Sequence, residues 1–272
     1  MLSTRIVTAI VLLAAFGAAL VLLGGTQFAI LVALLVAAGA YEWGKLSHFG
    51  PRATLAYAGA MTLVFAALLW LLEPTEMRQS VLQAVFGGSL ILWVVVLPIW
   101  LRAGVGRRLQ WLLPLAGFAV LLPAALAMVV MQRSQLLLAL GVVWVSDTAA
   151  FFTGRALGRH KLAPNISPSK TWEGLLGAFI ATAGYAIICA LFVPQIAVRV
   201  HGAVWLVYLA AAELLLAASV IGDLFESALK RQASVKDSGS LLPGHGGVLD
   251  RIDSATAVLP IAALLMYWMA ST

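Results

Sequence analysis

Nine charged side chains and a glycine-rich turn lie within the 33 residues from 222 to 254. The acidic residues are Asp223, Glu226, Asp237, Asp250 and Asp253, and the basic residues are Lys230, Arg231, Lys236 and Arg251. The turn, residues 243–247, reads Pro-Gly-His-Gly-Gly. Carboxylates that enter from two helices make an all-oxygen site suited to Mg²⁺, cations hold phosphate oxygens, and glycines let backbone amides approach a ligand. Phosphoryl or nucleotidyl transfer requires these same parts.

The first part of this segment is predicted to extend an apolar helix beyond the bilayer. On that helix Asp223, Ser227 and Lys230 are spaced i, i+4 and i+7 and share one face. The turn then breaks the helix, and Asp250 and Asp253 follow at i, i+3 before the last span. Acids at the end of a span are costly, so their presence favours a functional role. One alternative stays open, in which acids and bases at a membrane surface simply pair with each other.

A second polar segment, residues 153–174, is predicted on the same side of the membrane. Its Ser167, Lys170 and Thr171 suit a phosphate or a nucleotide, and two prolines keep their loop out of a helix. The alternative is a connecting loop that carries one interfacial lysine. All five aspartates lie in or beside these two segments, the first of them being Asp147.

The composition places these segments in a membrane protein. Of the 272 residues, 62% are hydrophobic and 10% are charged, whereas an ordinary soluble domain carries roughly 25% charged residues. A soluble fold, a disordered chain and a disulfide scaffold are therefore excluded, the last because there is one cysteine. The net charge of +6 suits an anionic leaflet better than a nucleic acid, since no basic stretch is interleaved with aromatics.

Charge-free runs delimit the spans. Residues 6–41 suffice for two passes with a bend at Gly24-Gly25, although the second is short. Each further span reaches the roughly 20 residues needed to cross the hydrocarbon core. These spans are 53–72, 79–101, 109–132, 135–152 with Asp147, 174–198, 203–222 with Glu213, and 254–272. We therefore expect an all-α, polytopic integral membrane protein with about nine transmembrane helices.

The distribution of positive charge supports this topology. With nine helices, 14 of the 17 Lys and Arg residues fall on one side, which the positive-inside rule assigns to the cytoplasm. We therefore expect a multi-pass inner-membrane protein with a cytoplasmic N-terminus, an outer C-terminus and both polar segments, 153–174 and 222–254, at the cytoplasmic face. The chain is predicted to form a single integral membrane domain, 1–272, with N-terminal helices in 1–140 and a catalytic half in 141–272.

Residues 227–253 resemble the signature of the CTP:phosphatidate cytidylyltransferase family. The signature runs Ser-x-x-Lys-Arg, four residues, Lys-Asp-x-Gly, three residues, Pro-Gly-His-Gly-Gly, two residues and Asp-Arg-x-Asp. Each fixed position is filled, by Ser227, Lys230, Arg231, Lys236, Asp237, Gly239, Pro243, Gly244, His245, Gly246, Gly247, Asp250, Arg251 and Asp253. Residues 167–174 also resemble the family's Ser-Pro-x-Lys-Thr-x-Glu-Gly stretch. The likeness covers about residues 141–255.

The resemblance implies a homodimeric membrane enzyme that makes CDP-diacylglycerol and pyrophosphate from CTP and phosphatidate with Mg²⁺. It implies Asp223 and Asp250 as metal ligands, and a second, monovalent cation with Asp147 or Asp253 nearby. A phosphate oxygen of phosphatidate would attack the α-phosphorus of CTP in line. A general base is optional, because a phosphomonoester has its second pKa near 6.

The remaining predicted residues would hold the two anionic substrates or assist the chemistry. The catalytic set is Asp223, Asp250, Lys230, Arg231 and His245. The substrate-binding set is Ser167, Lys170, Thr171, Ser227, Lys236, Gly246, Gly247 and Arg251. His245 would donate to a phosphate or to the leaving group, or would only brace the turn. Asp237 is expected to pair with Lys236 or Arg231 rather than to bind metal.

Three other classes of membrane protein fit the sequence less well. A transporter with Asp147 and Glu213 as coupling sites predicts polar groups near the midplane of several helices, whereas this chain gathers them at one face. A CDP-alcohol phosphotransferase carries an Asp-Gly-x-x-Ala-Arg stretch, which this sequence lacks. A purely structural membrane protein has no need of the loop 222–254.

Overall fold

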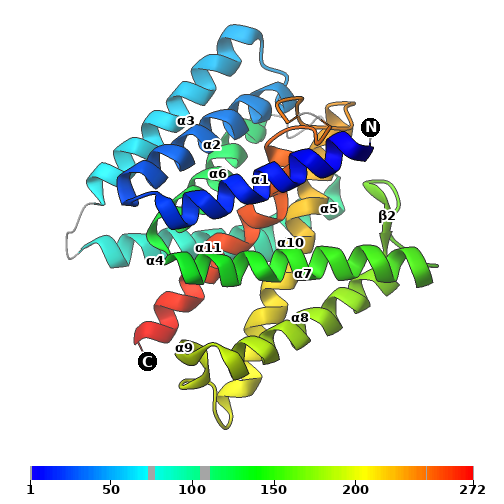
Figure 1. Cartoon of the computed structure of the whole chain (residues 1–272). Helices are drawn as coiled ribbons and strands as arrows, with labels where there is room; N and C mark the ends of the chain where they lie inside the picture. The colour runs from blue at the N-terminus through cyan, green and yellow to red at the C-terminus, as the bar shows by residue number, and fades with distance from the viewer. Residues whose placement is uncertain (1, 73–76, 105–110, 243, 272) are drawn as a thin grey trace.

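Long apolar helices make up nearly all of the computed structural model, which describes residues 2–72, 77–104, 111–242 and 244–271 (Figure 1). The helices are α1 (Leu2–Leu22), α2 (Gly25–Leu46), α3 (Pro51–Leu71), α4 (Met77–Ile91), the π-helical turn η1 (Leu92–Val96), α5 (Leu97–Ala103), α6 (Leu113–Val130), α7 (Arg133–Leu157), α8 (Trp172–Phe192), α9 (Pro194–Ala197), α10 (Val204–Gln232) and α11 (Leu249–Ser271). Two short strands, β1 (Lys161–Ala163) and β2 (Ser167–Thr171), form an antiparallel hairpin between α7 and α8. The predicted all-α class is confirmed.

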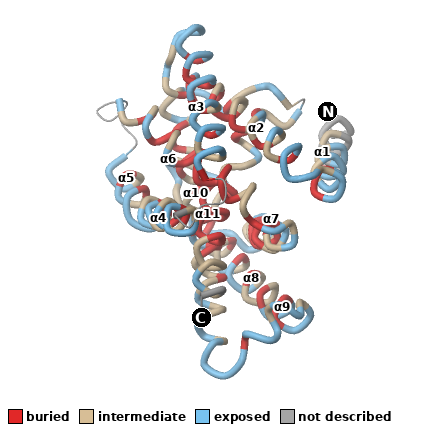
Figure 2. The backbone as a smooth tube through the Cα atoms, turned by 90° about the vertical axis from the view of Figure 1, so that its left-hand side faces the viewer, coloured by how far each residue is buried: buried red, intermediate tan, exposed pale blue. Residues whose placement is uncertain are grey.

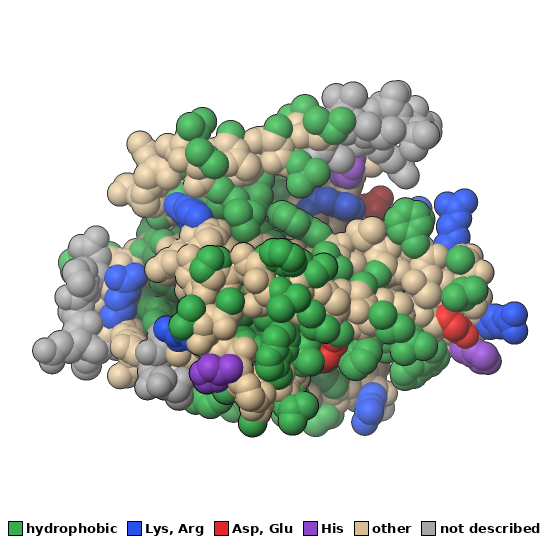
Figure 3. Space-filling model, turned by 60° about the horizontal axis from the view of Figure 1, so that its bottom comes forward, with side chains coloured by type: hydrophobic (Ala, Val, Ile, Leu, Met, Phe, Trp, Pro, Cys, Tyr) green, Lys and Arg blue, Asp and Glu red, His purple; other side chains and the backbone are tan. Residues whose placement is uncertain are grey.

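Eight helical spans in the described part of the chain are long and apolar enough to cross a membrane. The α4–η1–α5 unit counts as one of them, Arg78–Ala103. The apolar stretch of α1, Ile10–Leu22, is shorter than these spans, so the total of nine stays a prediction. Hydrophobic side chains cover much of the face in Figure 3, with Lys and Arg toward its edges. Such a surface suits a bundle enclosed by lipid.

A break between α1 and α2 divides the first charge-free run near Gly24, as predicted. The N–H of Gly24 donates to Oε1 of Gln27 at 2.6 Å, which partners one of the free amides at the start of α2. The second half of the run is longer than expected, because α2 continues past it to Leu46. Glu42 is therefore carried on a helix and is buried within the bundle.

α10 and α11 cross at the centre of the bundle. α10 packs on α8 and α11, and α11 also packs on α4, α6 and α7. Figure 2 shows buried residues concentrated where α6, α10 and α11 meet. α10 also continues to Gln232, which confirms the predicted extension of this span.

An aromatic cluster fixes α10 against the first half of the chain. The ring of Phe225 lies 5.7–6.2 Å, between centroids, from three tryptophan rings on α2, η1 and α5. These are Trp43, Trp93 and Trp100. Residues two apart on a helix point to nearly opposite faces. The cluster therefore holds α10 by the face that is opposite to Asp223.

The segment between α7 and α8, predicted as a loop, contains the β1–β2 hairpin. The N–H of Trp172 donates to the carbonyl oxygen of His160 at 3.0 Å, which holds the start of α8 against the chain that leads into β1. α7 and α8 approach closely below the hairpin, since a Cβ on Gly174 would lie 2.8 Å from the carbonyl oxygen of Ala150. This close approach brings β2 over the end of α7.

The two ends of the bundle differ in what they carry. Figure 1 shows the N-terminal end of α1, β2 and the loop between α10 and α11 at one end, with the C-terminus and α9 at the other. This arrangement agrees with the predicted placement of the termini on opposite sides and of both polar segments on the side of the N-terminus.

We expect Phe225→Ala to destabilise the protein, because it empties the centre of the aromatic cluster. The cost should be about 3–5 kcal/mol, the usual range for Phe→Ala in a packed core. Thermal unfolding in detergent measures it as a lower transition temperature. Phe192→Ala is the matched control, because that ring is 77% exposed. Equal transition temperatures for both variants and the parent protein would contradict the role of the cluster.

Candidate functional site

A polar cleft of about 740 Å³ lies between α7, α8, α10, α11 and β2. The five aspartates of the chain all line it: Asp147, Asp223, Asp237, Asp250 and Asp253. Six basic side chains line the same cleft: Arg155, Lys170, Lys230, Arg231, Lys236 and Arg251. Of the other residues predicted from the sequence, Thr171 and Ser227 join the lining, while Ser167, His245, Gly246 and Gly247 lie outside it. The two polar segments therefore contribute to one site.

Lys230 joins α10 to α11 through two carboxylates. Its Nζ lies 2.8 Å from Oε2 of Glu226, one turn earlier on α10, and 2.6 Å from Oδ1 of Asp250 on α11. All three side chains are largely shielded, and that of Asp250 is 5% exposed. Charges removed from water in this way need good geometry and further hydrogen bonds to offset the cost of desolvation.

Asp250 supplies those further hydrogen bonds. Its Oδ2 accepts from the N–H and the hydroxyl of Ser238 and from the N–H of Gly247, each at 2.8 Å. With Lys230 on Oδ1, four donors surround a group that has about four lone-pair sites. Asp250 is thus the anchor of the loop between α10 and α11 in this structure. Its role as a metal ligand stays a prediction.

Asp223 faces the hairpin across the cleft. Nζ of Lys170, on β2, lies 2.6 Å from its Oδ2, and the hydroxyl of Ser227 donates to its Oδ1 at 3.3 Å. The side chains of Lys170 and Asp223 are 23% and 29% exposed, so substrates can reach this pair. The predicted face of α10 is confirmed, since Asp223, Ser227 and Lys230 all line the cleft.

Thr171 and Glu173 organise the start of α8. The Thr171 hydroxyl accepts the N–H of Gly174 at 3.1 Å and caps the helix. Oε1 of Glu173 lies 2.6 Å from Nδ1 of His160, and its carboxylate accepts the N–H of Arg159. Glu173 does not line the cleft and instead ties the start of α8 to the chain that leads into β1. Substrate contact by Thr171 stays a prediction.

Four basic side chains in the cleft form no ion pair with any acid in the described residues. They are Arg155, Arg231, Lys236 and Arg251. The expected pairing of Asp237 with Lys236 or Arg231 is likewise not found in the described part of the chain. The acids and bases of the cleft therefore do not all pair with each other. These four cations are able to bind phosphate oxygens.

Glu42, which the sequence reasoning missed, holds the loop from the other side. Its side chain accepts hydrogen bonds from the N–H groups of Val248 and Leu249 at 3.0 and 2.9 Å. The hydroxyl of Ser238 lies 3.1 Å from Glu42, which shares the single hydroxyl proton with Asp250. The residue is 1% exposed. A carboxylate at the start of α11 satisfies amides that have no partner within the helix and is favoured by the helix dipole.

The glycines of the turn make room for these carboxylates. A Cβ on Gly239 or on Gly247 would collide with the Glu42 side chain. Gly246 has φ +82°, and a Cβ there would lie 2.7 Å from Oδ2 of Asp250. Gly247 already donates its N–H to Asp250. Substrate contact by Gly246 and Gly247 stays a prediction, and Pro243 lies outside the described residues.

The remaining carboxylates decide whether a metal fits. Asp147, Asp223 and Asp253 come from α7, α10 and α11 and interact electrostatically across the cleft. Among the described residues, no three His, Cys, Asp or Glu side chains already stand at metal-ligating distances. Mg²⁺ needs no such cage, because it usually binds one or two carboxylates together with waters and substrate phosphates. The all-oxygen donor set therefore fits a Mg²⁺ ion that phosphates complete.

Comparison with known proteins finds relatives along the whole chain. The model of a family described as the cytidylyltransferase family matches residues 3–269. A phosphatidate cytidylyltransferase from Pseudomonas aeruginosa is 37% identical over 281 residues, which cover 98% of this chain and 97% of the relative. Phosphatidate cytidylyltransferases from Haemophilus influenzae and Brucella suis are 31% and 38% identical over 290 and 275 residues, covering 99% and 98% of this chain and 100% and 92% of the relatives.

We expect Glu42→Gln to loosen the loop between α10 and α11, because glutamine offers one acceptor oxygen and no charge. Hydrogen bonds to charged groups are worth about 1.5–3 kcal/mol each, so thermal stability should fall as well. Limited trypsin digestion after Lys236 measures the loop directly and should become faster.

Gly247→Ala should also make trypsin digestion after Lys236 faster, because the added Cβ displaces the Glu42 side chain. Glu213→Gln is the control, since its carboxylate lies within α10, away from the loop. Unchanged digestion rates in both loop variants would show that Glu42 does not hold the loop.

Proposed function

Because the chain belongs to the cytidylyltransferase family, we propose that it transfers the cytidylyl group of CTP to phosphatidate, yielding CDP-diacylglycerol and pyrophosphate. The observation that carries this proposal is the polar cleft, which joins five aspartates and six basic side chains at one end of an apolar bundle. Such a site suits a reaction between a water-soluble nucleotide and a lipid headgroup. A transporter fits less well, because Asp147 lies with the other aspartates instead of standing alone in the membrane.

The unpaired cations of the cleft would bring the substrates together. CTP and phosphatidate are both polyanions and repel each other in solution. Arg155, Arg231, Lys236 and Arg251 line one cleft without an acidic partner in the described residues. Binding phosphate oxygens there offsets the repulsion and fixes the two substrates in one orientation.

The reaction exchanges one phosphorus–oxygen bond for another. A phosphate oxygen of phosphatidate attacks the α-phosphorus of CTP, and the bond from that phosphorus to the oxygen bridging to the β-phosphate breaks. Pyrophosphate leaves with the electron pair. No side chain needs to remove a proton, because a phosphomonoester with a second pKa near 6 is mostly ionised at neutral pH. Positioning and charge neutralisation are therefore the main tasks of the protein.

The carboxylates of the cleft would hold Mg²⁺, which when bound neutralises charge on the triphosphate. Asp223 is a partly exposed donor, with Asp147 and Asp253 beside it in the cleft. Asp250 would coordinate the ion only if Lys230 moved from Oδ1 of Asp250 to a substrate phosphate. A second, monovalent cation is proposed at the same group of acids, on the strength of the resemblance.

Lys170 and Lys230 would change partners when substrates bind. Each now lies 2.6 Å from an aspartate oxygen, on Asp223 and Asp250 respectively. An ammonium group can turn toward a phosphate while a cation takes its place on the carboxylate. These pairs would keep the carboxylates compensated between turnovers.

We place the cleft at the cytoplasmic face of the inner membrane. The excess of Lys and Arg in the segments that form it supports this orientation, as does the position of the N-terminal end of α1 at the same end of the bundle (Figure 1). A homodimer is also proposed, and it rests on the family resemblance.

The reaction is tested with purified protein in detergent, labelled CTP, phosphatidate and Mg²⁺, by following label into the lipid phase. We expect Asp250→Asn to lower turnover about 100-fold or more, the usual effect of removing a preorganised electrostatic group. Glu213→Gln, on α10 outside the cleft, should retain the parent rate. Wild-type turnover by the Asp250 variant would contradict its assignment to the site, and equal use of ATP or GTP would contradict CTP as the substrate.

Metal dependence is tested by titrating Mg²⁺ after removal of divalent ions with EDTA. We expect activity to disappear with EDTA and to return with Mg²⁺. Asp223→Asn should raise the Mg²⁺ concentration for half-maximal activity about 10- to 100-fold, and Glu213→Gln should leave it unchanged. Full activity in EDTA, or identical titrations for both variants, would exclude Asp223 as a metal ligand.

A further inference from the structure

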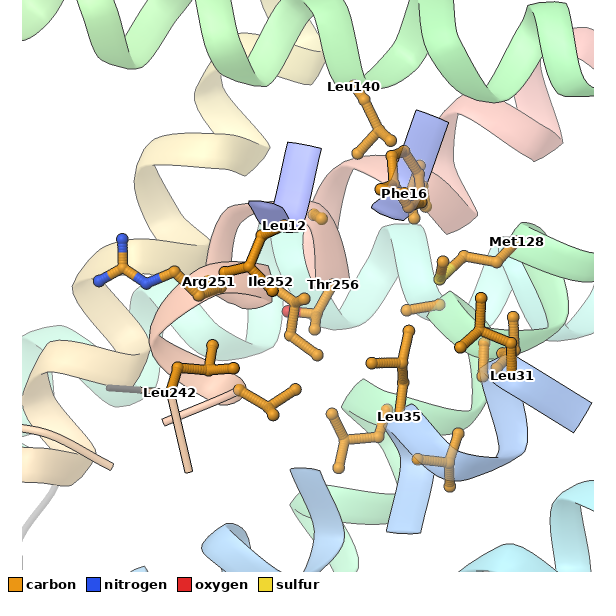
Figure 4. A pocket seen from close by; sticks show the side chains of 18 of the residues that line it. Leu12, Phe16, Leu31, Leu35, Met128, Leu140, Leu242, Arg251, Ile252 and Thr256 are labelled. Carbon is orange, nitrogen blue, oxygen red and sulfur yellow. The ribbon is translucent and has the colours of Figure 1, made fainter. Parts of the chain in front are cut away.

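A separate apolar cavity of about 490 Å³ lies on the other side of α11 from the polar cleft. Side chains from α1, α2, α6, α7 and α11 form its wall, and Figure 4 shows them converging on a common space. Leu12 and Phe16 come from α1, Leu35 from α2, and Met128 from α6. Of the residues assigned above to the reaction, His245 and Arg251 line this cavity.

α11 lies between the two spaces, and different faces of this helix line them. Asp250 and Asp253 are three residues apart and line the polar cleft, whereas Ile252 and Leu259 line the apolar cavity. Arg251 lines both. In Figure 4 its guanidinium points away from the apolar side chains, so its aliphatic stem borders the cavity while its charge is directed elsewhere.

The cavity is therefore apolar over most of its wall and polar at one end. His245 also lines it, and the buried Nδ1 of His245 has no hydrogen-bond partner among the described residues. A buried polar atom without a partner is costly, so it points to a ligand that brings one. An apolar group that ends in a polar atom able to pair with this nitrogen matches this distribution.

We propose that the cavity binds one acyl chain of the phosphatidate whose phosphate lies in the polar cleft, with Arg251 at the junction. This inference rests on the proposed function. If each methylene group takes the ~30 Å³ of a water molecule in the liquid, roughly sixteen of them would fill 490 Å³. That number corresponds to one acyl chain of an ordinary phospholipid. Continuity through Arg251 favours the substrate over an unrelated membrane lipid.

α1 forms the wall between this cavity and the surrounding bilayer. Leu12 and Phe16 face the cavity, while Ile10 and Val11 are 60% and 58% exposed on the outside. Figure 2 shows α1 standing at the margin of the bundle. A chain that leaves the bilayer beside α1 would therefore reach the cavity without crossing the polar cleft.

Ala15→Phe tests the proposal by filling the cavity from α1. Ala15 lines the cavity but is exposed, so the added ring has space to enter it without displacing the buried core. We expect the KM for dioleoyl phosphatidate to rise about tenfold through loss of buried methylene contacts, with the KM for CTP unchanged. Ala14→Phe, on the same helix and outside the cavity, is the matched control. Equal KM values for both variants would overturn the proposal.

A photoreactive phosphatidate with a diazirine in mid-chain gives a readout independent of turnover. We expect cross-links on α1, α2, α6 or α11 that unlabelled phosphatidate competes away and phosphatidylglycerol does not. Equal competition by both lipids, or cross-links only on outward-facing residues, would overturn the acyl-chain site. Specific cross-linking without cytidylyl transfer would instead refute the proposed reaction and leave the lipid site standing.

Discussion

Burying carboxylates at the edge of a membrane is the constraint on which the site depends, because each one must find donors or a cation there. Asp250 and Glu42 meet this requirement with the same loop: Ser238 donates to both, and the N–H groups of Gly247, Val248 and Leu249 complete the two sets. These hydrogen bonds hold the loop between α10 and α11 against α2 and α11. The hydrogen bonds from this loop to Asp250 and Glu42 offset the desolvation cost of burying the two carboxylates.

Other side chains of the cleft take no part in holding this loop and are available to bind substrates or a metal ion. Asp250 is surrounded by four donors, whereas within the described residues Asp223 is paired only with a lysine that substrates can reach and with a serine hydroxyl. Four cations in the cleft have no acidic partner in the described residues. The aromatic cluster around Phe225 packs on the face of α10 opposite to Asp223, so the part of the site that α10 carries is fixed by side-chain packing.

Sequence reasoning identified most of the cleft and missed what supports it. The spacing of Asp223, Ser227 and Lys230 predicted one helix face, because helical periodicity is local and can be counted. Glu42 gave no such signal, since its partners lie about 200 residues away and only the fold brings them together. The hairpin was missed because Ser-Pro-Ser-Lys-Thr lacks the alternation of a strand. The apolar cavity depends on how five helices pack, and no pattern within one of them reveals it.

The central claim is that the carboxylates of this cleft hold a divalent ion between two polyanions. Crystals grown with Mn²⁺ in place of Mg²⁺ and a non-hydrolysable CTP analogue test it most directly through anomalous scattering. The account predicts one strong peak inside the cleft, within coordination distance of a carboxylate oxygen of Asp223 and of a triphosphate oxygen. A peak remote from Asp223, or a bound nucleotide with no metal in the cleft, would contradict it.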